Sequence, residues 1–267
     1  MVTEEKDPFI SAYKKIFTLS KTVSQREYTY SGFTLGEIYA LAAGLKKTLS
    51  RRGAEKTICL CTENKAVIAA SILASLSGAC KLVLPHSFSS HALVEMYEAV
   101  GFDAAIADHP EELPGVEIIT PLAGNPDDLD CDSMRNPDEP FLRLFTGGST
   151  GKPKVWSKSP RNLLTEALYL RDKFDITSKD LLVSTVPPYH IYGLLFTILL
   201  PLLAHARVMP EIFTFPQEII ATFNRHKASV LVSVPIHYRS MKVDNLSLPS
   251  LKIAFSSSGV LNRSDAS

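Results

Sequence analysis

Along this chain, short apolar runs alternate with longer segments whose apolar residues recur at helical spacing. In the first half, the short runs predict buried strands over residues 57–61, 79–85 and 104–108. Helical spacing predicts helices over residues 8–17, 34–49, 65–76 and 90–100. Because strands that alternate with helices favour a parallel sheet with covering helices, the sequence predicts an α/β fold.

Local signals predict where these elements begin and turn. Thr34 and Glu37 form a T-x-x-E capping box, in which two backbone N–H groups are satisfied reciprocally. Asn64 stands at the N-cap of the next helix, and Ser89 or Ser90 stands at that of the third. Residues 27–33 alternate and then turn, which predicts a small hairpin.

The second half repeats the pattern after a polar interval. Residues 109–140 are rich in Pro, Asp, Glu and Asn, which predicts a solvated connector with a short strand at 116–120. Further strands are predicted over 141–145, 155–159, 180–186, 229–235 and 251–255, and helices over 160–174 and 216–227. The apolar run 191–206 predicts a buried helix followed by a strand, since it falls short of a ~20-residue membrane span. We therefore expect two α/β subdomains, residues 1–140 and 141–267.

Composition and charge argue against several classes of protein. Hydrophobic residues make up 45% of the chain, and 28 basic residues balance 28 acidic ones, so there is no basic excess for nucleic acid. The four cysteines form no C-x-x-C pair and accompany no histidine cluster, so no metal site is predicted. Cys59 and Cys61 alternate within an apolar strand and are predicted to be buried free thiols, which suits a cytoplasmic protein. Residues 1–20 lack the apolar core of a signal peptide.

One stretch, Phe145 to Lys154, carries the clearest chemistry. It contains three glycines, and glycine lets a backbone approach a ligand closely. Its N–H groups and hydroxyls can point at one anion, and Lys154 adds a positive charge. The residues predicted to bind polyphosphate are Thr146, Gly147, Gly148, Ser149, Thr150, Gly151 and Lys154.

This stretch is not a P-loop, which requires G-x-x-x-x-G-K followed by Ser or Thr. Gly151-Lys152 is followed by Pro153, so no hydroxyl follows the lysine to hold magnesium. The alternative is a Gly/Ser-rich surface turn beside a basic strand. We favour phosphate binding, because so many positions of the string fit one chemical purpose.

The string resembles the signature loop of the AMP-forming adenylating enzymes, which include acyl-CoA synthetases, luciferases and peptide-synthetase adenylation domains. Their usual form is T-S-G-T-T-G-x-P-K, and here Gly147 replaces a serine and Ser149 replaces a threonine. The resemblance implies that Thr146, Ser149, Thr150 and Lys154 face the phosphate oxygens of ATP.

A second candidate follows the predicted strand at 180–186. Ligands usually bind at the carboxyl ends of strands in α/β sheets, and Tyr189, His190, Tyr192 and Gly193 can line an acyl or aromatic pocket there. The alternative is a buried histidine packed against a helix start. The family carries P-x-x-H-x-x-G at this place, matched by Pro187, His190 and Gly193. The resemblance implies that His190, the catalytic residue we predict, lies beside the acyl substrate and the α-phosphate.

A third candidate follows the strand at 251–255, where the chain reads Ser256-Ser257-Ser258-Gly259-Val260-Leu261. From the residues alone, a plain turn between a strand and a helix is the alternative. The order resembles the family's S-G-G-A-P-L loop, on which adenine packs. The resemblance therefore implies that Ser257, Ser258 and Gly259 contact the base.

The resemblance spans about residues 33–263 and implies the fold of the family's N-terminal large domain. That fold is a layered αβαβα arrangement of two mostly parallel sheets flanked by helices. The family's magnesium-binding glutamate, its ribose-binding aspartate and its small C-terminal domain with a catalytic lysine have no counterpart in this chain. We therefore expect a truncated portion whose main Mg²⁺ ligand lies elsewhere and which is inactive alone.

Together these observations predict ATP-dependent activation of a carboxylic acid to an acyl-adenylate, then transfer to a thiol. The thiol is that of CoA or of the phosphopantetheine on an acyl carrier protein. The apolar run after His190 favours an aliphatic or aryl acid over an amino acid. One alternative is a nucleotide- or acyl-binding module without catalysis. The other, an α/β hydrolase, requires a G-x-S-x-G elbow that the sequence lacks.

Overall fold

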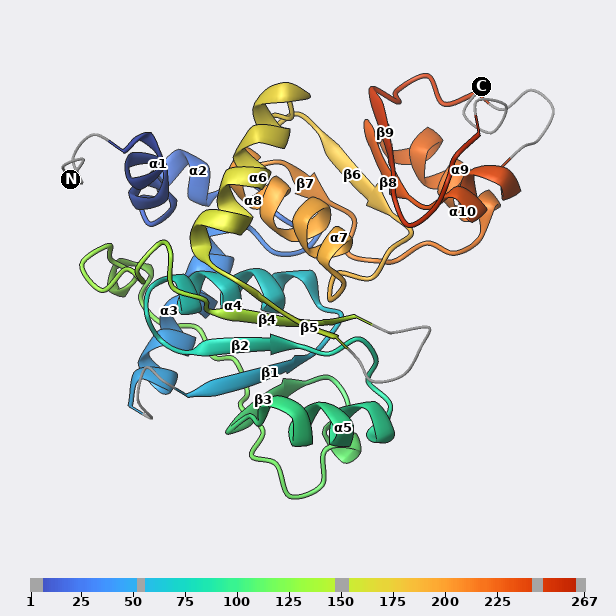
Figure 1. The fold of residues 1–267 in the computed structure, drawn as a ribbon. Coiled ribbons are helices and arrows are strands. Elements are labelled where there is room, and N and C mark those ends of the chain that lie inside the picture. Colours follow the sequence, from blue (N-terminus) through green and yellow to red (C-terminus); the bar gives the residue numbers. More distant parts are fainter. Residues whose placement is uncertain (1–6, 52–55, 147–153, 242–246, 263–267) are drawn as a thin grey trace. The chain divides into compact units, whose positions relative to one another are not determined.

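The computed structural model describes residues 7–51, 56–146, 154–241 and 247–262. The chain forms two compact units, one of residues 1–26 with 34–166 and the other of residues 27–33 with 167–267. Each unit is built on its own sheet, with helices packed on the sheet faces (Figure 1). The α/β class, with two mostly parallel sheets flanked by helices, is confirmed.

The first unit contains a five-stranded sheet in the order β3-β1-β2-β4-β5. The strands are β1 (Thr57–Cys61), β2 (Lys81–Leu84), β3 (Ala104–Ala107), β4 (Leu142–Thr146) and β5 (Lys154–Lys158). The first four are parallel, whereas β5 is antiparallel to β4. A parallel neighbour would need a crossover of about a dozen residues or more, and only residues 147–153 separate these two strands. The predicted strand at 116–120 is a single bridge between Ile118 and Ala105.

Helices cover both faces of this sheet, with α3 and α4 on one side and α5 on the other (Figure 1). The helices of this unit are α1 (Pro8–Ile16), α2 (Lys21–Ser24), α3 (Leu35–Ser50), α4 (Lys65–Leu76) and α5 (Ser90–Val100). Helix α6 (Pro160–Lys173) begins in it, and the connector holds two short 3₁₀ turns, η2 (Pro110–Glu112) and η3 (Pro126–Asp128). The predicted caps are confirmed, because Thr34 and Glu37 form both bonds of the capping box and Asn64 and Ser89 accept first-turn N–H groups.

The second unit contains a four-stranded parallel sheet in the order β7-β6-β8-β9. Its strands are β6 (Leu181–Ser184), β7 (Arg207–Val208), β8 (Val230–Ser233) and β9 (Ile253–Ser256). The apolar run after β6 forms α7 (Ile191–Leu194), a π-helical turn η4 (Leu195–Leu199) and α8 (Leu200–Ala204), so the predicted buried helix is present. The other helices are α9 (Pro216–His226) and α10 (Pro235–Ser240). Leu181 and Val183 pack with Ile219 and Phe223 of α9 in the core of this unit.

The small hairpin predicted at residues 27–33 is present in a reduced form. The Tyr28 N–H donates to the Phe33 carbonyl at 2.7 Å, and the Leu35 N–H donates to the Arg26 carbonyl at 2.8 Å. The backbone thus turns back on itself and pairs at a single bridge, not along two strands. Thr29 also bridges Val208 of β7 in parallel, and the fully buried Tyr28 donates its hydroxyl to the Ile198 carbonyl at 3.1 Å. Local bonds therefore hold the turn, while the Tyr30 N–H and the Tyr28 carbonyl pair with the distant Val208.

Within the described parts of the chain, we find no helix with the length and apolar character needed to cross a membrane.

Candidate active site

Thr146 and Lys154 stand at the two ends of the predicted phosphate loop. They are directly opposite each other in the antiparallel pair β4–β5, so the strands hold the ends of residues 147–153 together. Lys154 lies at an exposed position at the start of β5. The predicted contacts Gly147, Gly148, Ser149, Thr150 and Gly151 lie outside the described residues. The strand pairing thus places Lys154 beside Thr146 at one end of the β4–β5 pair.

The other predicted residues lie in the second unit, at the carboxyl edge of its sheet. Strands β6, β8 and β9 are parallel, so the segments that follow Ser184, Ser233 and Ser256 all leave from this edge. The hydroxyls of Thr185 and Ser233 are 2.8 Å apart and buried, which ties two of the strand ends together. This is the edge at which parallel α/β sheets usually bind ligands.

His190 begins the helix that follows β6. It is the N-cap residue of α7 and is exposed, so the alternative of a buried histidine is wrong. Its ring centroid lies 4.7 Å from that of Tyr189. A Cβ at Gly193 would lie 1.9 Å from the carbonyl oxygen of Pro187. The P-x-x-H-x-x-G spacing thus has a local reason, because the turn that presents His190 leaves no room for a side chain at Gly193.

Tyr192 lies against the sheet edge. Its hydroxyl donates to the Ser233 carbonyl at 3.2 Å, and burial raises the pKa of this phenol, so the donor proton is retained at neutral pH. Its ring is 5.0 Å from that of Phe196. Phe255 lies 4.6 Å from Phe196 and 4.9 Å from Phe174. We call these four side chains, Phe174, Tyr192, Phe196 and Phe255, the aromatic cluster.

The bend Ser257–Gly259 leaves β9 at the same edge. Ser258 has a φ of 66°, in the left-handed region that few residues other than glycine adopt. A pocket of about 290 Å³ lies beside this bend, lined by Val234, Pro235, Ile236, Arg239, Ser258, Gly259 and Val260. Arg239 donates to the Val260 carbonyl at 2.9 Å. A guanidinium and exposed apolar side chains therefore meet next to two of the three predicted residues.

Four of these lining residues come from α10 and its entry, which the sequence interpretation missed. It extended the preceding strand to Pro235, whereas β8 ends at Ser233 and Pro235 occupies the first turn of α10. The available signal was Pro235 itself. Proline is common at the first helical position, because a backbone N–H at that position would have no hydrogen-bond partner within the helix.

The side chains on this edge are of kinds that bind anions and apolar groups. The exposed His190, the guanidinium of Arg239 and the hydroxyls of the bend can bind anions, while apolar side chains can hold a flat or aliphatic group. Among the residues that the structure describes, no cluster of three or more His, Cys, Asp or Glu side chains could hold a metal ion.

Comparisons with known proteins agree with this chemistry. The family model described as AMP-binding enzyme matches residues 14–267. Acyl-CoA ligase SID4 from Ajellomyces capsulatus is 29% identical over 98 residues, which are 36% of this chain and 17% of that protein. Acetyl-coenzyme A synthetase from Cupriavidus necator is 28% identical over 255 residues, covering 77% of this chain and 38% of that protein.

The fold also matches solved structures. ATP-bound MatB from Rhodopseudomonas palustris superposes with a TM-score of 0.79 at 20% identity, covering 95% of this chain and 56% of that one. The chain thus spans about half the length of that enzyme and a smaller share of the curated relatives it matches. Because the family model covers nearly all of it, the chain belongs to the AMP-binding enzyme family.

Proposed function

We propose that the full-length protein activates a carboxylic acid with ATP to form an acyl-adenylate and pyrophosphate, and then transfers the acyl group to a thiol. The observation that carries this proposal is the match to the AMP-binding enzyme family over residues 14–267. Relatives named as acyl-CoA ligase and acetyl-coenzyme A synthetase support CoA as the thiol, with carrier-protein phosphopantetheine as the second candidate.

In this proposal, Lys154 and the loop that it follows bind the phosphates. The pairing of Thr146 with Lys154 supports this role, since it keeps a hydroxyl-bearing residue and a cation at the two ends of one short loop. Gly147, Gly148, Ser149, Thr150 and Gly151 contribute N–H groups and hydroxyls. Mg²⁺ neutralises charge on the phosphates, and we expect its main ligand outside these 267 residues.

The base and the acid are assigned to the carboxyl edge of the second sheet. We assign adenine to the pocket beside Ser258 and Gly259, whose 290 Å³ and apolar walls suit a flat heterocycle. His190 is assigned to the carboxylate and α-phosphate, with Tyr189, Tyr192 and Gly193 around the acyl group. The aromatic cluster next to Tyr192 supports an aliphatic or aryl acid, because it offers that acid an apolar boundary.

Pyrophosphate release by the full-length protein, measured with ATP, Mg²⁺ and a panel of aliphatic, aryl and amino acids, tests this function. We expect release with one aliphatic or aryl class, and acyl-CoA when CoA is added. Binding of ATP without release for any acid would favour the non-catalytic nucleotide-binding module. We expect the 267-residue chain alone to release negligible pyrophosphate, and we assign the enzyme to the cytoplasm.

Substitution of Lys154 by alanine separates phosphate binding from general effects on folding. A hydrogen bond from a charged group contributes about 1.5–3 kcal/mol, so the kcat/KM for ATP should fall about 10- to 150-fold. Lys158→Ala is the matched control, because Lys158 lies at the other end of the same strand. Equal losses in the two variants, or none in Lys154→Ala, would remove Lys154 from the site.

A further inference from the structure

Cys59 and Cys61 form a close pair of thiols in the first unit. Side chains two apart on a strand point to the same face, and here the two sulfur atoms are 3.3 Å apart. Cys59 is fully buried, and Cys61 is 5% exposed. Both belong to the apolar cluster between β1 and α5, together with Leu93 and Met96. The proposed adenylation chemistry uses neither thiol.

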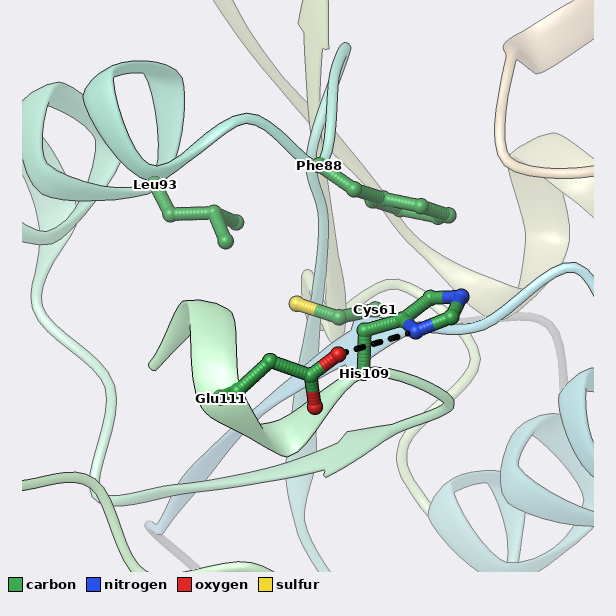
Figure 2. A pocket seen from close by; sticks show the side chains of 5 residues that line it. All are labelled: Cys61, Phe88, Leu93, His109 and Glu111. Carbon is green, nitrogen blue, oxygen red and sulfur yellow. Dashed lines mark hydrogen bonds and ion pairs between the residues drawn. The ribbon is translucent and has the colours of Figure 1, made fainter. Parts of the chain in front are cut away.

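A pocket of about 280 Å³ opens onto the second of these thiols. Its lining residues are Cys61, Phe88, Leu93, His109 and Glu111. Figure 2 shows Phe88 and Leu93 above Cys61 in that view, the His109 ring to its right, and Glu111 below it. His109 and Glu111 are paired at 3.1 Å and are largely exposed, at 73% and 66%. A small molecule that enters therefore passes a polar rim and meets Cys61 against apolar walls, with the Cys59 sulfur 3.3 Å from that of Cys61.

The distance between the sulfurs restricts what can bind both of them. A disulfide needs the sulfurs about 2.05 Å apart, so they would have to approach by roughly 1.3 Å. One atom bonded to both sulfurs at about 2.3 Å, the usual Zn–S length, would subtend roughly 90° at the present separation. That angle is well below the tetrahedral value, and within the described chain no third His, Cys, Asp or Glu completes a metal site. An angle near 90° suits a pyramidal three-coordinate centre that bonds through p orbitals.

We propose that Cys59 and Cys61 are a binding site for trivalent organoarsenicals, with the organic group held in the pocket beside Phe88 and Leu93. The reaction is a condensation: two As–S bonds form, the As=O bond breaks, and the oxygen leaves as water with the two thiol protons. Nothing is oxidised or reduced. An apolar cavity of about 150 Å³ holds benzene, so a phenyl group fits the 280 Å³ available.

The other cysteines do not offer this geometry. Cys131 is exposed and Cys80 is buried at other places in the fold, and burial raises the pKa of the Cys80 thiol to about 12. Burial also raises the pKa of Cys59, so this thiol stays protonated at neutral pH. Alkylating reagents, which need the thiolate, should therefore react slowly with Cys59.

The test uses the folded full-length protein and phenylarsine oxide in the presence of excess β-mercaptoethanol. After removal of free arsenical, the protein is unfolded, alkylated with N-ethylmaleimide and digested with trypsin. Cleavage after Lys56 and Lys65 places both thiols in one peptide, Thr57–Lys65, apart from Cys80 and Cys131. We expect that peptide to gain one phenylarsenic group, to lose two hydrogens and to escape alkylation. Release by 2,3-dimercaptopropanol, but not by the monothiol, is expected for a two-sulfur adduct.

Cys59→Ser and Cys61→Ser should each abolish the adduct, whereas Cys131→Ser, the matched control, should leave it unchanged. If circular dichroism shows that a serine variant does not fold, the adduct on peptide Thr57–Lys65 of the wild-type protein decides the test by itself. Full alkylation of peptide Thr57–Lys65 after treatment, or arsenic on Cys131 alone, would overturn the proposal. So would an adduct that either single variant retains.

Discussion

Gly193→Ala tests the turn that presents His190. The added Cβ would lie 1.9 Å from the Pro187 carbonyl oxygen and 2.7 Å from its carbonyl carbon, whereas ordinary contacts begin at 3.4 Å. The chain must therefore open by about 1.5 Å, which is 3.4 minus 1.9, and both groups are backbone. The Leu194 N–H bond to the His190 carbonyl, at 2.7 Å, resists that movement.

Overpacking of a well-packed site costs about 1–3 kcal/mol, and a clash with backbone should lie at the upper end of that range. For a domain of about 150–250 residues, each kcal/mol lowers Tm by roughly 2–4 °C, so we expect a loss of about 4–12 °C. Thermal unfolding of the full-length protein, followed by circular dichroism, measures the fall in Tm, and urea unfolding, followed by tryptophan fluorescence, measures the loss of unfolding free energy. Pyrophosphate release should fall as well, since His190 moves with the helix start.

Gly259→Ala is the matched control for this substitution. Its Cβ would meet the Pro235 ring at 3.5 Å, which is ordinary van der Waals contact. We expect its unfolding free energy to stay within about 0.5 kcal/mol of wild type, as for most surface substitutions. If Gly193→Ala were equally mild, the close approach of Pro187 to Gly193 would be refuted, and with it our reason for the glycine.

Three further substitutions test other contacts. Tyr192→Phe removes the donor to the Ser233 carbonyl and should cost about 0.5–1.5 kcal/mol in urea unfolding, and an unchanged midpoint would contradict the hydrogen bond. Thr34→Ala removes the cap of α3 and should cost about 1 kcal/mol by the same measurement, with no loss expected if the box does not form. Hydrogen bonds from the Thr34 backbone and hydroxyl hold the pKa of Glu37 below its ordinary value of 4.5. The ionised carboxylate therefore contributes its full stabilisation above pH 4.5, and this stabilisation is lost as the pH falls through the folded-state pKa. In Glu37→Gln, the unfolding free energy measured against pH should lack this loss in acid. If the variant lost as much stability in acid as the wild type, the role of Glu37 would be contradicted.

Features set by neighbouring residues were predictable from the sequence. The capping box at Thr34 and the cap at Asn64 depend on side chains within three residues, and both are present. Strand β4 was visible in the sequence as an apolar run. The glycine-rich stretch after it predicted nucleotide binding, which the match to the AMP-binding enzyme family supports in general terms. The division at residue 140 and the individual site residues stay predictions.

Features set by distant partners were not predictable in the same way. The turn at residues 27–33 was predictable from its own residues, whereas its bridge to Val208 was not, because nothing in the sequence around Val208 marks that pairing. Helix α10 has six residues, too few to display a helical period, and with it the sequence interpretation missed most of the pocket beside Gly259. The strand direction of β5 follows from the length of the preceding loop and not from its residues.

The bridge between Thr29 and Val208 also affects how the protein is made. Their positions differ by 179 in the chain, and synthesis at about 5–20 residues per second separates their appearance by roughly 9–36 s. Throughout that interval Tyr28 and Thr29 have left the ribosome without the partners that bury them. Because this N-terminal segment stays exposed during synthesis, we expect chaperones to bind the nascent chain. Expression of residues 167–267 alone would for the same reason leave the outer edge of β7 without its bridging residue.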